Sequence, residues 1–380
     1  MITADQRHAA LIDTLVRSGE LVDDRLIAAF RATPRHLFIP EAGALTVHGT
    51  VLDRRTSPDA WLAAVYADDA IITQVDDGDP ARPRGRPTSS SSAPTIVARM
   101  LEAADLRDGQ RVLEIGTGTG WNAALLAARL GDANVTTLEV DAEVLAGARS
   151  ALAASGRSPT VHLRDGETGY PPGAPYDRTI ATCSVTRVPR AWIEQTRVGG
   201  IVVTPWTAME GAGVLAPLTV AADGSAAGRF RGGLGFMLLR GQRSPDAPSH
   251  DIGAEPDETR LVDVDPITPL TEFATAFPIT FMVPRWRMGL RRMGTGMGLW
   301  LSATDGPSWA RVYPYGSVWT VEQGGPRSLW DEVESATAEW NALGSPDQDR
   351  FGLTVAPDDR HRVWLDTPNG PGWDFAQPNR

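Results

Sequence analysis

The chain has 380 residues, of which 42% are hydrophobic, and carries a formal net charge of -11 at pH 7. This length suits a catalytic core with a smaller second domain, and the acidic balance argues against a protein that binds nucleic acid through a basic surface. The 36 basic residues are all arginine, which excludes lysine nucleophiles and Schiff-base chemistry.

Cysteine and histidine usage argues against a metal centre. The single cysteine, Cys183, cannot form an internal disulfide or a multi-cysteine zinc site, and no two histidines are spaced four residues apart. The first residues lack the basic and apolar regions of a signal peptide, and no stretch reaches the ~18 apolar residues of a membrane span. We therefore expect a cytoplasmic protein without a metal and without a membrane partner.

The N-terminal segment predicts two helices, at residues 3–18 and about 23–31. Thr3 and Gln6 have the spacing of a capping box at the start of the first helix. Further on, residues 66–74 end in a candidate strand, and the Gly, Pro and Asp of residues 76–87 predict a loop.

Four serines, Ser89 to Ser92, precede a predicted helix that begins at Pro94. A serine run can be a flexible linker, but the helical spacing of the apolar residues after Pro94 favours the start of a helix. Backbone N–H groups at such a position favour an anion. Ser92 is therefore a candidate hydrogen-bond donor to a carboxylate, with Ser91 as a rival one position away and helix capping alone as the simpler alternative.

Strand and helix patterns alternate from residue 111 onward. The predicted strands are 111–115, 134–139, 160–164, 178–182 and 201–205, and the predicted helices are 120–130, 142–154 and 189–197. This alternation predicts an α/β fold, a doubly wound and mainly parallel Rossmann-like sheet with an N-terminal helical segment.

The composition changes in the segment 241–256, which is rich in Ser, Pro and Asp. Beyond it, short strand patterns surround a predicted helix at 329–342, with Ser328 as its cap and Asp331 at the third helical position. The predicted strands lie near 298–303, 310–313, 317–321, 351–355 and 362–365. We therefore expect a catalytic domain at 1–245 and a smaller α+β domain at 246–380, with peptide-substrate recognition as its candidate role.

A glycine-rich turn lies between the predicted strand 111–115 and the helix that follows. Glycines at 116, 118 and 120 allow the backbone to approach a nucleotide closely. A dinucleotide fold prefers the spacing G-x-G-x-x-G and places a pyrophosphate there. Here the spacing is G-x-G-x-G, and the acidic Glu114 lies two residues before the first glycine. A carboxylate suits the cationic amino and sulfonium groups of S-adenosylmethionine, so the turn predicts that cofactor, with S-adenosylhomocysteine as the product.

Two further acidic residues follow the next two predicted strands. Glu139 ends one strand, where a carboxylate can bind both ribose hydroxyls, and Asp165 ends the other, close to the expected adenine. Helix capping is the simpler interpretation of Glu139, and turn formation that of Asp165. The predicted cofactor-binding residues are Glu114, Gly116, Thr117, Gly118, Gly120, Trp121, Asn122, Glu139, Val140, Asp165 and Gly166.

Several segments resemble motifs of the protein-L-isoaspartate (D-aspartate) O-methyltransferase family. Residues 112–124 are similar to its first motif, which ends in an aromatic residue followed by a polar one, and Ser92-Ala93-Pro94 is similar to its Ser-x-Pro active-site element. The other matches are Pro34–Pro40, Pro175–Ile180 and Gly199–Pro205, so that the resemblance spans roughly residues 3 to 210.

The resemblance implies methyl-esterification of an aspartyl or isoaspartyl carboxylate, with Ser92 in the active-site element. The chain departs from the family at Thr95, where a ring is usual, at Ser90-Ser91, where the family has Thr-Ile, and in its extension, which ordinary repair enzymes lack. Extended relatives that this chain resembles belong to actinobacterial gene clusters for ribosomally made peptides of the lanthipeptide and graspetide type. The resemblance therefore implies a modified precursor peptide as the favoured substrate, converted through an aspartimide.

The chemistry requires no general base, because a carboxylate with a reference pKa of about 4 is already ionised at pH 7. Three alternatives remain open: a general isoaspartate repair enzyme, a small-molecule methyltransferase, and an inactive scaffold. The segment Arg285–Met293 combines arginine, tryptophan and methionine, which suits an adaptable cleft for an acidic peptide. The same residues also suit the core and rim of an ordinary domain.

Overall fold

The computed structural model describes residues 2–82, 85–209, 212–243, 255–263, 266–293 and 296–375, which form two compact units. Unit 1 comprises Met1–Ser184, Pro189–Pro205 and Pro217–Ala226, and unit 2 comprises Val185–Val188, Trp206–Ala216 and Ala227–Arg380. The expected division at residue 245 therefore lies inside unit 2, and much of the segment 241–256 lies outside the described residues.

Unit 1 begins with α1 (Ala4–Arg17), α2 (Asp24–Ala32) and the short helix η1 (Arg35–Phe38). The predicted capping box is confirmed: Thr3 Oγ1 accepts a hydrogen bond from the backbone N–H of Gln6 at 3.2 Å, and Gln6 Oε1 accepts one from the N–H of Thr3 at 2.9 Å. Both predicted helices are present with nearly the expected bounds.

A small antiparallel sheet follows, with strand order β2-β1-β3-β4. Its elements are β1 (Ala42–Thr46), β2 (Val51–Asp53), α3 (Pro58–Val65), β3 (Ile71–Val75), η2 (Asp76–Gly78) and β4 (Pro87–Ser91). The strand expected near residue 71 is present, but the serine run was not expected to be a strand. Ser90 and Ser91 pair with Ile72 and Ile71 of β3, and this partner strand makes up for the weak strand propensity of serine.

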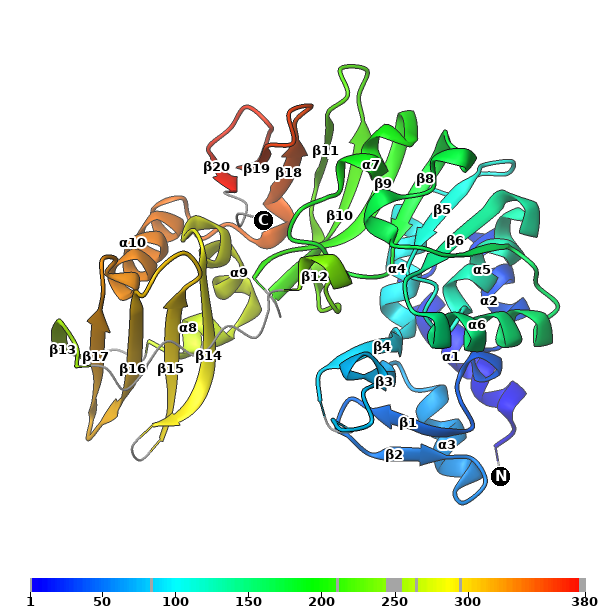
Figure 1. The fold of residues 1–380 in the computed structure, drawn as a ribbon, viewed down its shortest axis with the longest axis horizontal. Helices are drawn as coiled ribbons and strands as arrows, with labels where there is room; N and C mark the ends of the chain where they lie inside the picture. The colour runs from blue at the N-terminus through cyan, green and yellow to red at the C-terminus, as the bar shows by residue number, and fades with distance from the viewer. Residues whose placement is uncertain are drawn as a thin grey trace. The chain divides into compact units, whose positions relative to one another are not determined.

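The main sheet of unit 1 is parallel, with strand order β8-β5-β6-β7 and β9 next to β8. Figure 1 shows these strands with helices α5 and α6 alongside. The elements are α4 (Pro94–Ala103), β5 (Val112–Ile115), α5 (Trp121–Leu130), η3 (Asp132–Asn134), β6 (Val135–Glu139), α6 (Ala142–Ala154), β7 (Thr160–Leu163), η4 (Gly166–Thr168), η5 (Pro171–Gly173), β8 (Tyr176–Ala181), α7 (Arg190–Glu194) and β9 (Thr196–Met209). The predicted α/β fold is confirmed. β9 extends beyond the expected 201–205 at both ends, because it includes Gly199 and Gly200 on one side and continues past Pro205 to Met209 on the other.

The boundary between the units crosses β9 and β10 (Ala212–Val220), which contribute residues to both. The remaining elements of this region are β11 (Ala226–Arg229), β12 (Arg231–Leu234), which pairs with β10, and η6 (Arg240–Gln242). None of the helices formed by the described residues has the length and apolar character that a membrane span requires.

Unit 2 contains an antiparallel sheet with strand order β13-β17-β16-β15-β14, which is visible beside α10 in Figure 1. From residue 258 onward, the elements of unit 2 are β13 (Glu258–Val262), α8 (Thr268–Thr271), α9 (Phe273–Met282), β14 (Trp286–Met293), β15 (Gly296–Ala303), β16 (Trp309–Tyr315), β17 (Val318–Gly324), α10 (Leu329–Ala342), η7 (Gln348–Arg350), β18 (Phe351–Val355), β19 (His361–Leu365) and β20 (Gly372–Phe375). Of these, β18, β19 and β20 are not part of the five-stranded sheet. Buried side chains such as Leu301, Val312 and Val333 join sheet and helices into one core.

The helix expected at 329–342 is confirmed as α10, with Ser328 at the N-cap position. The expected capping interaction is wrong, however, because the Ser328 side chain makes no capping hydrogen bond. Its backbone carbonyl accepts the first hydrogen bond of the helix, from the N–H of Glu332 at 3.1 Å.

Candidate active site

The carboxyl ends of four neighbouring parallel strands bring the predicted cofactor residues to one edge of the sheet. The glycine turn follows β5, Glu139 ends β6, Asp165 follows β7, and Thr182 follows β8. Since β6 and β7 lie on one side of β5 and β8 on the other, the strand order reverses at β5. Open α/β sheets bind ligands in the crevice at such a reversal.

The glycine turn has a backbone that only glycine adopts readily. Gly116, Gly118 and Gly120 have φ of 91°, 55° and 87°. A Cβ atom on Gly116 would lie 2.7 Å from Thr182 Oγ1, and one on Gly118 would lie 3.4 Å from the carbonyl oxygen of Ser90. The turn therefore lies directly against both the end of β8 and the serine strand β4.

Glu114 is fully buried beneath this turn. Its Oε1 accepts a hydrogen bond from Asn122 Nδ2 at 2.7 Å, and its Oε2 accepts one from Thr137 Oγ1 at 2.5 Å. Because that bond uses the only hydroxyl proton of Thr137, the Thr117 hydroxyl donates to Thr137 Oγ1, which is 2.7 Å away. Burial raises the pKa of the Glu114 carboxyl to about 7. Glu114 thus ties α5 and β6 to the turn, and its effect on a bound cofactor stays a prediction.

Glu139 has only 8% of its surface exposed, and its carboxylate binds the glycine turn directly. Oε2 accepts from the N–H of Gly118 at 2.9 Å, and Oε1 accepts from those of Val140 at 2.9 Å and Asp141 at 3.1 Å. Burial raises the pKa of Glu139. Helix capping alone does not account for this residue, because Asp141 is the N-cap of α6.

Asp165 and Gly166 lie at the end of β7, as expected. Asp165 is exposed, and its Oδ1 accepts from the N–H of Glu167 at 2.9 Å, so the turn-forming interpretation describes an interaction that is present. Gly166 is buried, and a Cβ atom there would lie 2.4 Å from Ile115 Cγ2. Gly166 therefore permits close packing of this turn on β5.

The two candidate serines differ in their surroundings. Ser91 is 2% exposed, and its Oγ accepts a hydrogen bond from Arg35 Nε at 3.3 Å. Ser92 is half-buried and follows the end of β4. The capping interpretation of Ser92 is wrong, because Ala93 is the N-cap of α4. The Ser91 hydroxyl is thus directed at a buried arginine, which leaves Ser92 as the better candidate for a substrate contact.

Arg35 was not predicted as a site residue, although it organises the serine strand. Its guanidinium is fully buried, and its Cζ lies 5.3 Å from the centroid of the Trp121 ring on α5. Burial lowers its pKa to about 10. The backbone carbonyls that accept its hydrogen bonds are those of Val65, Ala67, Asp69, Ser91 and Ser92, at 2.8 to 3.1 Å. The resemblance of Pro34–Pro40 to a family segment was the signal that could have identified Arg35.

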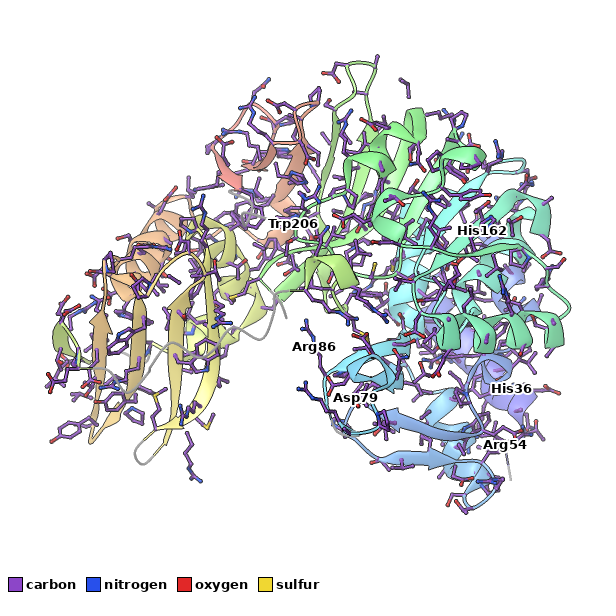
Figure 2. The ribbon with its side chains drawn as sticks, in the orientation of Figure 1. His36, Arg54, Asp79, Arg86, His162 and Trp206 are labelled. Atoms are coloured by element: carbon purple, nitrogen blue, oxygen red, sulfur yellow. The ribbon has the colours of Figure 1, made fainter. Side chains whose placement is uncertain are left out.

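Two neighbouring contacts complete this region. Thr95, at the position where the resembling family carries a ring, donates its hydroxyl to Asp68 Oδ2 at 2.6 Å, and its backbone N–H donates to Asp68 Oδ1 at 2.8 Å. His36, which is labelled in Figure 2, follows Arg35, and its Nδ1 lies 2.5 Å from the Tyr66 hydroxyl. The start of α4 and η1 are thus held to the segment that connects α3 with β3.

Known proteins are similar in sequence to the part of the chain that contains this site. The profile of the family described as Protein-L-isoaspartate(D-aspartate) O-methyltransferase (PCMT) matches residues 6–241. A protein-L-isoaspartate O-methyltransferase of Ignicoccus hospitalis is 35% identical over 203 residues, which cover 53% of this chain and 82% of the relative. One of Thermococcus onnurineus is 33% identical over 244 residues, covering 64% of this chain and 97% of the relative.

A solved structure described as protein-L-isoaspartate O-methyltransferase has the same fold. The match covers 95% of this chain and 100% of the other, with a TM-score of 0.54 and 20% sequence identity. Because 95% of the chain includes most of the region after residue 245, that relative has a counterpart of the C-terminal region. The family profile ends at residue 241, so the residues after it form the expected C-terminal extension relative to that profile.

Proposed function

The chain belongs to the protein-L-isoaspartate(D-aspartate) O-methyltransferase family, and from this membership we propose which of its groups perform the reaction and which substrate it takes. It is an S-adenosylmethionine-dependent protein carboxyl O-methyltransferase. One observation carries the assignment of roles: the backbone of Gly118, in the cofactor turn, lies against the carbonyl of Ser90, two residues before Ser92. The methyl donor and the carboxylate are thereby assigned to neighbouring elements.

The glycine turn and its acidic residues fit S-adenosylmethionine. Gly116 and Gly118 have no side chain, so the backbone of the turn is open to a ligand. Burial raises the pKa of both Glu114 and Glu139, and a cationic ligand nearby would favour their ionised forms. We assign the ribose hydroxyls to Glu139 and the adenine to the turn at Asp165. When bound, S-adenosylmethionine supplies an electrophilic methyl group on a positively charged sulfur.

The substrate carboxylate is the nucleophile and reaches the site already ionised. The chain must hold it in line with the methyl group and exclude water, a contribution that reaches roughly 7 to 11 kcal/mol for well-aligned reactants. We assign the hydrogen bond that orients one carboxylate oxygen to the Ser92 hydroxyl. Arg35 fixes the backbone of Ser91 and Ser92 through their carbonyls and thereby acts as a positioning residue.

The methyl ester formed in this way reacts further without the enzyme. The backbone nitrogen of the following residue attacks the ester carbonyl, methanol leaves with the nitrogen's proton, and a five-membered succinimide (aspartimide) results. Hydrolysis of either carbonyl then gives aspartate or isoaspartate. The same chemistry thus serves repair if isoaspartate is admitted, and peptide tailoring if aspartate is admitted.

As the substrate we propose a modified, ribosomally made precursor peptide, with general repair of isoaspartyl proteins as the alternative. The contact of Thr95 with Asp68 supports this choice, because a small polar side chain at the start of α4 changes the surroundings of Ser92 relative to a family member with a ring there. The relatives named above favour the alternative, since each is called a protein-L-isoaspartate O-methyltransferase.

Mass spectrometry of two substrates separates these choices. The protein and S-adenosylmethionine are incubated with a generic isoaspartyl peptide and, separately, with the product of a precursor-peptide gene adjacent to the gene for this chain. A mass gain of one methyl group, or a loss of one water after cyclisation, on the precursor alone supports peptide tailoring. A gain on the isoaspartyl peptide indicates repair, and no change on either peptide contradicts both. The Ser92→Ala variant serves as the control for enzymatic transfer.

A further inference from the structure

Strand β14 forms one edge of the antiparallel sheet in unit 2. It pairs with β15 along its whole length, from Trp286 opposite Ala303 to Met293 opposite Gly296, and no other described strand pairs with it. The backbone N–H and C=O groups on its outer side therefore have no ladder partner among the described strands. Such an edge can accept a further strand from another peptide.

The edge at β14 is strongly cationic in an otherwise acidic chain. It carries Arg287, Arg291 and Arg292 and no acidic residue, whereas the whole chain has a net charge of -11. The opposite edge, β13, differs, because it carries one arginine, Arg260, together with the acidic Glu258. The sequence of β14 is therefore the more basic of the two edges.

The two faces of β14 offer different contacts. Arg287, Gly289 and Arg291 share one face, since side chains alternate along a strand. The Arg287 guanidinium lies 5.8 Å from the centroid of the Trp300 ring, and a Cβ atom on Gly289 would lie 2.6 Å from that ring. This face therefore has two arginines separated by a flat aromatic surface.

The other face of β14 is more apolar. Leu290 lies on it with 52% of its surface exposed, and Met297 of β15 lies beside it with 50% exposed. Arg292 is on the same face. An added strand would therefore meet Arg287 and Arg291 on one face, and the apolar Leu290 and Met297 together with Arg292 on the other.

We propose that β14 binds an acidic, extended segment of the peptide substrate as an additional strand. Arg287 and Arg291 lie four positions apart on one face of β14. Acidic residues with the same spacing on the added strand would therefore lie directly opposite them, at the separation of about 4.5 to 5.5 Å that is usual for such pairs. An apolar residue at an intervening position of the other parity would cover Leu290. The proposal rests on the proposed function and adds to it a recognition site in unit 2 and a sequence pattern for the substrate.

Other occupants fit this edge less well. A second copy of β14 would bring arginines opposite arginines, and like charges directly opposite are destabilising. A nucleic acid offers no backbone ladder to the exposed N–H and C=O groups. Arginines can also simply protect an edge from pairing, and in that case the acidic segment would bring no gain in affinity.

Two peptides test the proposal with the full-length protein. The first is a short isoaspartyl peptide, and the second is the same peptide joined through a flexible Gly-Ser linker of about 20 residues to a segment with glutamates four positions apart and valine between them. Methyl transfer is measured for the protein, for Arg291→Glu, and for the control Arg231→Glu, an exposed arginine on β12 of the same unit.

We expect the acidic extension to lower KM by roughly threefold to tenfold and to leave kcat unchanged, since one or two partly exposed charge pairs and a strand ladder contribute modestly. Arg291→Glu should abolish this gain, whereas Arg231→Glu should retain it. The gain should also shrink as salt concentration rises. An equal KM for both peptides, or equal losses in both variants, would overturn the proposal.

Hydrogen exchange locates the contact independently of catalysis. The acidic segment alone, added to the protein, should slow amide exchange within 286–293. Binding that leaves these amides unprotected contradicts strand addition at β14. A dimer in sedimentation that forms through the same amides also contradicts it. Displacement of the segment by an oligonucleotide is the third contradicting outcome. If neither the short isoaspartyl peptide nor the precursor peptide is methylated, the proposed function fails, whereas the exchange result still decides the docking site.

Discussion

The fully buried guanidinium of Arg35 donates a hydrogen bond from Nη2 to the carbonyl oxygen of Ser92 at 2.9 Å, and a second from the same nitrogen to the carbonyl of Ser91 at 3.1 Å. Carbonyl groups and the Ser91 hydroxyl accept all its hydrogen bonds described above. An arginine is suited to this task because its planar group directs several donors in fixed directions. The position of Ser92 therefore depends on a residue 57 places earlier in the chain.

Replacing Arg35 by lysine should lower kcat for methyl transfer by roughly tenfold to hundredfold, because displacement of a reacting group by about 1 Å has effects of this size. The ammonium group cannot reach all the carbonyls, and each unsatisfied buried carbonyl costs about 1 to 3 kcal/mol. Binding of S-adenosylmethionine, measured by calorimetry, should change little. Steady-state kinetics on an isoaspartyl peptide gives kcat.

Arg178→Lys is the matched control. Arg178 is also buried, and its guanidinium donates to backbone carbonyls, among them that of Asp105 at 2.9 Å, but it lies at the start of β8. The control should lose stability in urea unfolding and keep its kcat. Equal losses of kcat in both variants would show that Arg35 has only a structural role.

Ser92→Ala should reduce kcat/KM for the carboxylate substrate by about tenfold to hundredfold, the effect of losing one hydrogen bond to a charged group. Ser91→Ala should instead mainly reduce stability, by about 1 kcal/mol, because its hydroxyl is buried against Arg35. Peptide methylation rates and urea unfolding of both variants provide the measurement. A larger rate effect at Ser91 than at Ser92 would reverse our assignment.

Glu139→Gln should weaken the binding of S-adenosylmethionine and S-adenosylhomocysteine alike, by roughly tenfold to hundredfold, because the ribose is common to both. The amide keeps the shape of the side chain, but its nitrogen cannot accept the hydrogen bonds that one carboxylate oxygen now accepts. Asp165→Asn, at an exposed position, should change affinity by less than about threefold. Calorimetric titration would contradict the ribose assignment if Glu139→Gln bound both ligands normally.

The buried carboxyl of Glu114 should make the stability of the ligand-free protein depend on pH. Its pKa is about 7 in the folded protein against 4.5 as the ordinary value, so between these values the folded state binds more protons than the unfolded state. The free energy of unfolding should therefore fall as pH rises from about 4.5 to about 7. The Glu114→Gln variant should lack this component when urea unfolding is followed across the same range. An identical pH profile in both proteins would contradict the raised pKa.

The same carboxyl should couple pH to cofactor binding. A cation bound nearby favours the ionised form of Glu114 and lowers its pKa, so binding should release protons near pH 7. S-adenosylmethionine carries the sulfonium charge that S-adenosylhomocysteine lacks. Its affinity should therefore rise more steeply with pH across this range, and equal slopes for the two ligands would count against Glu114 as the residue responsible.

Local sequence patterns determined the α/β core and the parts of the site that follow its strands. Apolar strand segments followed by amphipathic helices specify parallel strands, and parallel strands end at a common edge, so the turn at Gly116 and the residues Glu139 and Asp165 could be predicted to lie together. The capping box of α1 was equally local, since Thr3 and Gln6 interact within one helical turn. The edge strand β14 was missed because one glycine and three arginines interrupt its apolar pattern. The strand β9 was predicted too short because Gly199, Gly200 and Pro205 interrupt its pattern.

Only the tertiary structure decided how the serine run is held and which serine is available. The pairing of Ser90 and Ser91 with β3, the hydrogen bonds from Arg35, and the approach of Gly118 to Ser90 all join segments that are distant in the chain. The sequence by itself determined that Ser92 stands two residues before Pro94 and that an acid precedes the glycine turn. It could not determine the burial of Glu114 or of Arg35, because burial depends on which distant segments pack around a side chain, and burial is what shifts their pKa values and decides their roles.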